Sequence, residues 1–363
     1  MKDARIAFFA PMKAPDHETP SGDREMARNL MTALRATGAK VHLASDMRIY
    51  DGAGDPWQQS TLMEAAKPEI ARLTEEFAQD PPSIWVSYHN YYKSPDLIGP
   101  PVCAALNIPY VQIETSRARK RLSGPWAGFA RVAEEACDAA DLVFYMTVHD
   151  HETLERDRPD SQRLVHLPPF LPLENLPAPS PLDSPDIFAA GMMRAGDKLA
   201  SYELVAETLA LLDDQPMRLR IAGDGPVRRE VEKLMAPFGD KVRFLGRLDA
   251  GQMARAYRNA SLFFWPGVNE AYGMVYLEAQ AMGLPVVAQD RPGVRDVLAP
   301  GAHPAPEDGP QAMAETIRSQ LNDAALRRER GRQSRAFVAE NHLLTTARDI
   351  LTGALSPLIA GAS

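Results

Sequence analysis

Residues 269–288 read NEAYGMVYLEAQAMGLPVVA, and this stretch decides how the second half of the chain folds. An apolar run ends at Pro266 just before it, Gly273 opens a window of helical spacing, and Pro285 begins a second apolar run. A strand, a helix and another strand in this order are typical of a parallel sheet covered by helices. Gly273 lets the backbone approach a ligand closely, and the unpaired amides of a helix start favour phosphate.

Two carboxylates flank this predicted helix start. Glu270 lies in the loop before it, and Glu278 lies about one and a half turns into the helix. We predict that the two side chains hold polyol hydroxyls on either side of a diphosphate. The residues alone leave a second interpretation open, in which this is an ordinary helix N-terminus with two solvated acids.

Short apolar runs alternate with amphipathic windows along the whole chain, which predicts an α/β fold with two Rossmann-like domains. In the first half we expect a helix at about 23–37 and strands at 5–10, 41–45, 83–88, 110–113 and 142–146. In the second half we expect strands at 187–191, 219–222, 242–245, 262–265 and 285–288. Helices are expected there at 199–212, 272–282, 323–340 and 343–358.

A proline-dense stretch at residues 167–185 separates the two series. Proline lacks a backbone donor and resists both helices and central strands, so we place the domain boundary here. The predicted domains are an N-terminal domain of residues 1–170 and a C-terminal domain of residues 171–340. Residues 341–363 are predicted to form a helix that crosses back to the N-terminal domain.

Composition excludes several classes of protein. The formal net charge of -8 argues against a general nucleic-acid binder, because such proteins need a basic face. Cys103 and Cys137 have no metal-type spacing and are expected to be reduced core thiols. No stretch approaches the roughly 20 apolar residues of a membrane-spanning helix. We therefore expect a cytoplasmic protein, or one that is peripheral to the inner face of a membrane.

Residues 269–288 resemble the donor-site motif of retaining GT-B glycosyltransferases of family 4 (glycosyl transferases group 1). That motif has two glutamates separated by seven residues, an aromatic-glycine pair after the first, and a Gly-x-Pro-Val-Val strand behind the helix. Glu270 and Glu278 have this separation, Tyr272 with Gly273 matches the pair, and residues 283–287 complete the motif. The resemblance implies a GT-B fold, in which two Rossmann-like domains face each other across a cleft.

The resemblance also implies a role for each residue of the motif. Glu270 would hydrogen-bond the donor sugar, and Glu278 would grip the ribose of the nucleotide. The backbone around the helix start would meet the diphosphate, through Tyr272, Gly273, Met274 and Val275.

Residues 189–198 occupy the position where the family carries an arginine and a lysine that neutralise the diphosphate. By resemblance these roles fall to Arg194 and Lys198, with two solvated cations as the alternative. The match departs from the family pattern, because Met192 stands where arginine is usual and Lys198 comes one residue late. Gly223 lies in a turn that resembles the family's Gly-x-Gly-Pro turn near the donor. By the same resemblance, Leu245 ends a strand that matches the one whose end faces the nucleobase in the family.

In the N-terminal domain the resemblance implies an acceptor site. Ser21 and Gly22 precede a helix where the family often has a Gly-Gly loop, so Gly22 is predicted to meet the donor and Ser21 the acceptor. His89 follows the strand at 83–88, and we predict that it contacts a substrate, with a purely structural histidine as the alternative. Glu114 stands where many relatives carry histidine, and we predict that it contacts an acceptor hydroxyl.

Residues 116–131 contain no acid and carry several cations and aromatic side chains. Arg117 and Arg119 are predicted to contact an anionic acceptor. Alternatively, the stretch meets a membrane surface, with Trp126 and Phe129 entering the interface. A third interpretation is a solvated basic loop whose aromatic side chains lie in the core.

Together these features predict an enzyme that moves a sugar from a UDP- or GDP-sugar to the hydroxyl of a glycan, lipid-linked or small-molecule acceptor, with retention of configuration. Neither a metal nor a cofactor is expected, because no Asp-x-Asp signature stands out. The alternatives are a GT-B epimerase or phosphorylase, and a catalytically silent GT-B scaffold that binds nucleotide-sugars. A nicotinamide dehydrogenase is disfavoured, since no G-x-G-x-x-G follows the first strand. The sugar, the base, the linkage and the oligomeric state are not predicted.

Overall fold

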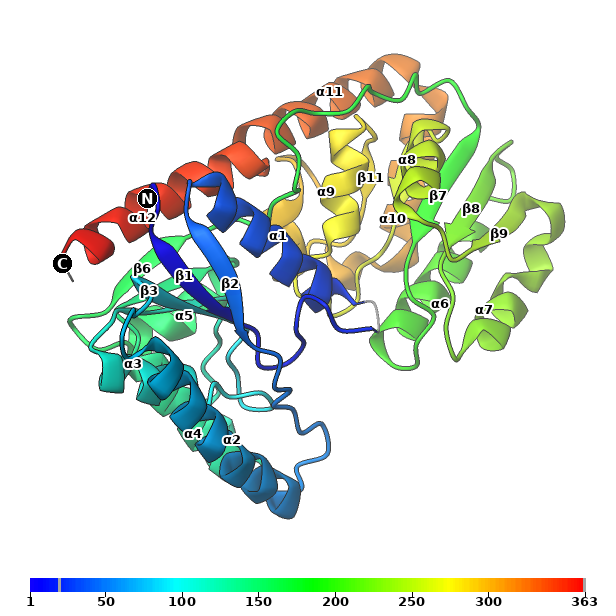
Figure 1. The fold of residues 1–363 in the computed structure, drawn as a ribbon. Coiled ribbons are helices and arrows are strands. Elements are labelled where there is room, and N and C mark those ends of the chain that lie inside the picture. The colour runs from blue at the N-terminus through cyan, green and yellow to red at the C-terminus, as the bar shows by residue number, and fades with distance from the viewer. Residues whose placement is uncertain (19–20, 362–363) are drawn as a thin grey trace. The chain divides into compact units, whose positions relative to one another are not determined.

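The computed structural model describes residues 1–18 and 21–361. The chain divides into two compact units (Figure 1). Unit 1 comprises Met1–Pro168 together with Leu344–Ser363, and unit 2 comprises Pro169–Leu343. Pro20, which precedes the first helix, lies outside the described residues.

Unit 1 contains a six-stranded parallel sheet in the order β2-β1-β3-β4-β5-β6. The strands are β1 (Arg5–Phe9), β2 (Lys40–Ser45), β3 (Ile84–Tyr88), β4 (Tyr110–Ile113), β5 (Leu142–Tyr145) and β6 (Arg163–His166). The strand order reverses between β1 and β3. In open α/β sheets, ligands bind beyond the carboxyl ends of the strands at such a switch point.

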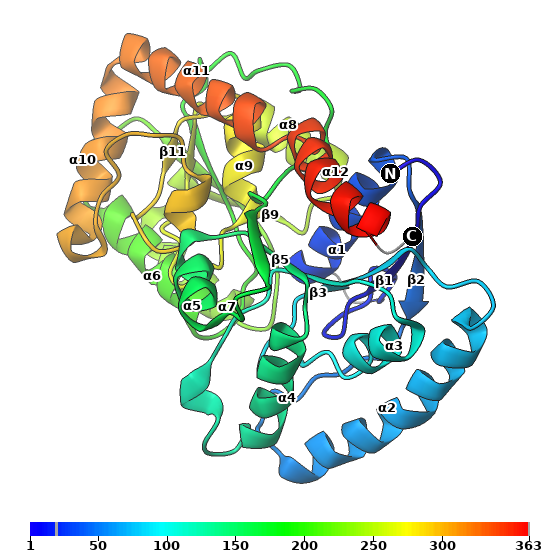
Figure 2. The ribbon, with the colours of Figure 1, turned by 90° about the vertical axis from the view of Figure 1, so that its left-hand side faces the viewer.

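Helices cover both faces of this sheet. They are α1 (Gly22–Ala36), α2 (Pro56–Phe77), α3 (Gly99–Leu106), α4 (Ala127–Asp138), α5 (Val148–Asp157) and α12 (Leu344–Gly361), with a short 3-10 helix η1 (Arg119–Arg121). The last helix, α12, returns to unit 1 and packs against α1 (Figure 1). Figure 2 shows α2 and α4 side by side on the opposite side of the sheet.

Unit 2 contains a five-stranded parallel sheet in the order β11-β10-β7-β8-β9. Its strands are β7 (Asp186–Ala190), β8 (Arg218–Ala222), β9 (Val242–Gly246), β10 (Leu262–Phe264) and β11 (Val286–Val287). Its helices are α6 (Asp197–Ala210), α7 (Arg228–Met235), α8 (Ala250–Arg258), α9 (Met274–Ala281), α10 (Gly309–Asn322) and α11 (Ala324–Asn341). Short 3-10 helices lie at η2 (Ala236–Lys241), η3 (Val294–Val297) and η4 (Pro306–Asp308). The order reverses between β7 and β10.

The predicted fold class, two Rossmann-like parallel sheets covered by helices, is confirmed. The expected helix at 272–282 is shorter, because Gly273 has a positive φ of 81° and α9 begins only at Met274. The proline-dense residues 167–185 contain no helix or strand. Within the described part of the chain, no helix is long and apolar enough to cross a membrane.

Candidate functional site

In unit 2, the loops that follow β7 and β10 meet at the switch point of the sheet. Lys198 lies in the first turn of α6, just after β7, and its Nζ pairs with Oε1 of Glu270, in the loop after β10. The same carboxylate oxygen accepts a hydrogen bond from Nε1 of the fully buried Trp265 at 2.9 Å. Lys198 Nζ also lies 5.9 Å from the centroid of the Trp265 ring. The structure therefore brings together Lys198 and Glu270, which the sequence predicted separately.

Two further hydrogen bonds hold the Glu270 loop against α6. Asn269 Nδ2 donates to Asp197 Oδ2 at 2.9 Å, and the backbone N–H of Val268 donates to Ser201 Oγ at 3.0 Å. Asn269 has a φ of 49°, a left-handed conformation that asparagine tolerates better than most residues. These contacts fix the position of the Glu270 carboxylate before any ligand binds.

Helix α9 starts directly after this loop. A side chain at Gly273 would place its Cβ 2.7 Å from the Tyr276 ring, so both space and the positive φ require glycine here. The amides of Met274 and Val275 lie in the first turn, where a helix has no internal acceptors for its N–H groups. Tyr272 is buried beside them. The start of α9 is therefore suited to an anion.

Glu278, on α9, has a hydrogen-bond partner on the neighbouring helix α8. Tyr257 Oη, from α8, donates to Glu278 Oε2 at 2.7 Å. Burial raises the pKa of Glu278 above its usual value, and the hydrogen bond from Tyr257 opposes this shift. Tyr257 thus orients the carboxyl group through one of its two oxygens.

Glycines let the ends of neighbouring strands come close together. A Cβ at Gly223, after β8, would overlap the carbonyl oxygen of Gly191, after β7, and Gly223 has a φ of 141°. A Cβ at Gly191 would lie 2.6 Å from the Trp265 ring. Arg194 is exposed on the loop after β7, and Leu245 is half-buried in β9. Neither makes a contact that ties it to the Lys198–Glu270 pair.

In unit 1, Ser21 caps α1, since its Oγ accepts a hydrogen bond from the backbone N–H of Arg24 at 3.2 Å. Gly22 is the first residue of that helix and has open space where a Cβ would lie. Both residues lie beyond the carboxyl end of β1. Their position at the switch point agrees with a ligand-binding loop, although no steric need explains the glycine.

A cluster of ionisable side chains lies at the carboxyl ends of β3 and β4. His89 Nδ1 lies 3.6 Å from Glu114 Oε1 and 3.7 Å from Asp23 Oδ1. His89 and Glu114 follow β3 and β4 directly and have φ values of 66° and 54°. Left-handed backbone at such residues costs energy and is found preferentially at functional sites. The predicted substrate contacts His89 and Glu114 are therefore neighbours.

Burial raises the pKa of Glu114 to about 7, an effect that the nearby His89 opposes and Asp150 reinforces. Burial also raises the pKa of Asp150, in the first turn of α5, against a hydrogen bond from Thr147. Asp23 and Asp150 were not predicted from the sequence. Both residues lie in the first turn of a helix that follows a strand. This position could have been used to predict them from the sequence, because it places side chains at the carboxyl ends of the strands, where ligands bind.

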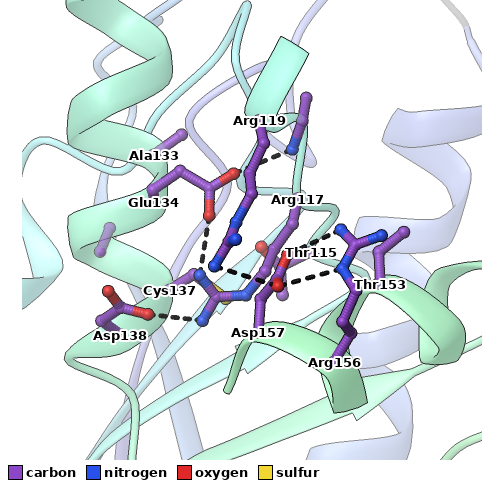
Figure 3. Close-up of polar contacts among 12 residues, drawn as sticks. Thr115, Arg117, Arg119, Ala133, Glu134, Cys137, Asp138, Thr153, Arg156 and Asp157 are labelled. Atoms are coloured by element: carbon purple, nitrogen blue, oxygen red, sulfur yellow. Dashed lines mark hydrogen bonds and ion pairs between the residues drawn. The ribbon is translucent and has the colours of Figure 1, made fainter. Parts of the chain in front are cut away.

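Arg117 and Arg119, the predicted anion contacts, belong to an ion-pair network (Figure 3). Arg117 is buried, and its two terminal nitrogens pair with Glu134 Oε2 at 2.7 Å and Asp138 Oδ1 at 2.5 Å. Arg119 Nη2 pairs with Asp157 Oδ1 at 3.0 Å but stays largely exposed. This placement argues against Arg117 as an acceptor contact, because two carboxylates already neutralise it. Phe129 is also fully buried, which excludes it from any membrane interface.

No group of three or more histidine, cysteine, aspartate or glutamate side chains within residues 1–18 and 21–361 has an arrangement that would hold a metal ion. The lysine and carboxyl side chains named above at the unit 2 site are Lys198, Asp197, Glu270 and Glu278, beside the helix-start amides.

Comparisons with known proteins point to the same half of the chain. Residues 184–323 match the family model described as Glycosyl transferases group 1. Similar curated proteins include a sulfoquinovosyl transferase of Arabidopsis thaliana, 35% identical over 98 residues, and a D-inositol 3-phosphate glycosyltransferase of Streptomyces bingchenggensis, 34% identical over 193 residues. These matches cover 27% and 46% of this chain but only 18% and 39% of those proteins. A D-inositol 3-phosphate glycosyltransferase of Arthrobacter sp. is 22% identical, over 90% of this chain and 89% of its own length.

Solved structures share the fold over nearly the whole chain. Sucrose-phosphate synthase from Thermosynechococcus elongatus has a TM-score of 0.73 at 20% identity, and the match covers 99% of this chain and 100% of that one. Anabaena HepE in complex with UDP-glucose has a TM-score of 0.69 at 15% identity, covering 97% and 99%. At these identities the likeness shows the fold, which is GT-B.

Proposed function

We propose that the protein is a glycosyltransferase that moves a sugar from a UDP- or GDP-sugar to an acceptor hydroxyl with retention of configuration. The observation that carries the proposal is the Lys198–Glu270 pair, which lies beside the start of α9 and is held by a hydrogen bond from Trp265 to Glu270. The family match supports it, because residues 184–323 include both loops of this site. We propose that the protein acts in the cytoplasm or at the inner face of a membrane.

The unit 2 site has the charge that a nucleotide diphosphate needs. Lys198 and the exposed Arg194 bring positive charge to the same side of the sheet as the free amides of α9. In the proposed reaction these groups stabilise the charge that develops on the departing diphosphate. This is electrostatic catalysis, and it requires neither a metal ion nor a protein nucleophile.

The two glutamates are proposed to hold the parts of the donor on either side of the diphosphate. Lys198 and Trp265 fix Glu270, so that its carboxylate accepts a hydrogen bond from a hydroxyl of the donor sugar. Tyr257 fixes one oxygen of Glu278 and leaves the other to the ribose. Gly223 directly follows β8 and Leu245 lies in the neighbouring strand β9, where the family resemblance places the nucleotide.

Unit 1 is proposed to bind the acceptor near His89, Glu114 and Ser21. The C1–O bond to the leaving phosphate breaks while the acceptor oxygen bonds to C1 on the same face. The acceptor proton passes to an oxygen of the leaving phosphate, which balances the charge. His89 and Glu114 are proposed to orient the acceptor hydroxyl.

A second candidate function is a catalytically silent protein that binds nucleotide-sugars. Met192 favours it, because this exposed residue stands where the family usually has arginine. Binding without turnover would distinguish this candidate from the transferase.

The test is a thermal-shift and nucleotide-release screen of the purified protein against UDP-, GDP- and ADP-sugars. The proposal predicts stabilisation by one nucleotide class and release of its diphosphate that depends on an acceptor. Release without any acceptor, with isomerised sugar as product, would point to an epimerase. No response to any nucleotide-sugar would refute the proposed donor site.

A further inference from the structure

Unit 1 carries an exposed apolar side chain that its own fold does not use. Trp57, in the first turn of α2, is 76% exposed, the highest value among the large apolar side chains of the described residues. Leu122, which follows η1, is 41% exposed. A single exposed apolar side chain is ordinary on a protein surface, but a contiguous amphipathic patch marks an interaction site.

These two side chains belong to segments that are packed together. Trp126 Nε1 donates to the carbonyl of Asp51 at 3.0 Å, and Gln59 Nε2 donates to the carbonyl of Pro125 at 2.9 Å. A Cβ at Gly54 would lie 2.6 Å from Pro125. Figure 2 shows the starts of α2 and α4 at the same end of the unit. We call the surface that the two segments form the tip patch, consisting of Trp57, Arg119, Lys120, Arg121, Leu122 and Pro125.

The charge of the tip patch is positive. Arg119, Lys120 and Arg121 are consecutive, and the first turn of α2 has no acidic residue. Of these three cations, Arg119 pairs with Asp157, which also pairs with Arg156. Asp55, the exposed acid nearest in sequence to Trp57, caps α2 and adds one negative charge beside the three consecutive cations. Because the whole chain has a net charge of -8, this concentration of cations is local.

A second feature keeps the cations at the surface beside aromatic rings. The guanidinium carbon of Arg121 lies 5.2 Å from the centroid of Trp126 and 5.0 Å from that of Tyr92. Lys93 Nζ lies 5.4 Å from the Trp126 centroid. Trp126 is therefore covered by cations, while Trp57 projects without such a cover.

We propose that the tip patch docks on an anionic lipid membrane, with Trp57 and Leu122 entering the headgroup region and Lys120 and Arg121 facing lipid phosphates. Exposed apolar side chains flanked by cations have the chemistry of an interfacial anchor. Trp57 and Leu122 take the place of Trp126 and Phe129, which the sequence predicted at the interface. This docking extends the proposed function by bringing the acceptor-binding unit to a surface where lipid-linked acceptors lie, and it rests on that function only for the role of the membrane.

The test is co-sedimentation of this 363-residue chain with vesicles of phosphatidylcholine alone or mixed with phosphatidylglycerol. We expect binding only to the mixed vesicles, and weaker binding as salt rises. Lys120→Gln should lower the partition coefficient about fivefold, and Trp57→Ala roughly tenfold. Lys233→Gln, which removes an exposed cation from α7 in unit 2, is the matched control and should change nothing.

Tryptophan fluorescence supplies an independent signal. Trp85 and Trp265 are fully buried and Trp126 is partly buried beside cations, so the part of a blue shift on adding mixed vesicles that depends on residue 57 reports Trp57. The variant Trp57→Phe should lose this shift and still sediment with the vesicles.

Equal binding to both kinds of vesicle, or none to either, would overturn the proposal. Self-association of the wild type without vesicles, lost in Trp57→Ala, would instead assign the tip patch to a second copy of the chain. The measurement needs neither a donor nor turnover. Failure here therefore leaves the transferase proposal intact, and failure of the nucleotide-sugar screen leaves the membrane result intact.

Discussion

Replacing Lys198 by alanine tests the proposed electrostatic role most directly. The side chains of Lys198 and Glu270 are only 23% and 13% exposed, so their charges act in a partly desolvated site. A unit charge about 4 Å from a developing phosphate charge is worth up to ~4 kcal/mol at an effective dielectric constant of about 20. Removal of one such group from other enzymes lowers kcat about 100- to 1000-fold.

Lys198→Ala also leaves Glu270 without its cation, next to where the diphosphate is proposed to bind. We therefore expect kcat at saturating donor to fall about 100- to 1000-fold, as ~2.7–4 kcal/mol of lost stabilisation. Lys198→Arg keeps the charge and is the matched control, which should retain most of the turnover. The assay is release of nucleotide diphosphate with a responsive donor and acceptor, alongside a thermal melt. An unchanged kcat in a folded Lys198→Ala variant would refute the reasoning.

Four further outcomes follow from named contacts. Glu278→Gln should weaken donor binding about tenfold, because it removes a charged acceptor for the ribose hydroxyls. Isothermal titration with the nucleotide diphosphate measures this, and an affinity equal to that of the wild type would refute the role of Glu278. The pKa of Glu114 is raised from 4.5 to about 7 in the folded protein. Protonated Glu114 therefore stabilises the fold by at most about 3 kcal/mol below pH 4.5, and this contribution is lost as the pH rises to about 7. Denaturant unfolding at pH 5 and pH 8 should thus show a smaller fall in stability for Glu114→Gln than for the wild type. Glu134→Ala should lower the free energy of unfolding by about 3–5 kcal/mol, because the buried Arg117 loses one of its two carboxylate partners. A melting temperature equal to that of the wild type would mean that water replaces the lost partner. Turnover should survive EDTA, and its loss with restoration by a divalent cation would contradict the proposed metal-independent mechanism.

Much of the unit 2 site follows from local sequence. Gly273, Glu270 and Glu278 lie within nine consecutive residues, so a strand, a loop and a helix start suffice to place them. Lys198 was also predicted, although its contact with Glu270 spans 72 residues. That prediction relied on resemblance, because nothing local links the two side chains. The role of Trp265 was missed, since its place between the two loops depends on the pairing of β10 with β7.

The unit 1 site was harder to predict from sequence. Asp23, His89, Glu114 and Asp150 come from four separate elements, and they converge only because the order β1-β3-β4-β5 sets the ends of those strands side by side. For the basic stretch at 116–131, the sequence predicted an anion contact at Arg117 that the structure argues against. Its cations are visible in the sequence, but the acids that neutralise Arg117 lie 17 and 21 residues later on α4.

The two sites differ in their electrostatics, and this difference supports the proposed division of labour. In unit 2, Lys198 and the free amides at the start of α9 favour a group that is negative in its ground state, as a diphosphate is. In unit 1, carboxyl groups crowd around His89, and burial raises the pKa of Glu114 to about 7. A carboxyl group near its pKa both donates and accepts hydrogen bonds at neutral pH, as a sugar hydroxyl does. The acidic edge of unit 1 is thus suited to hydroxyl acceptors, and Lys198 with the start of α9 to the departing phosphate.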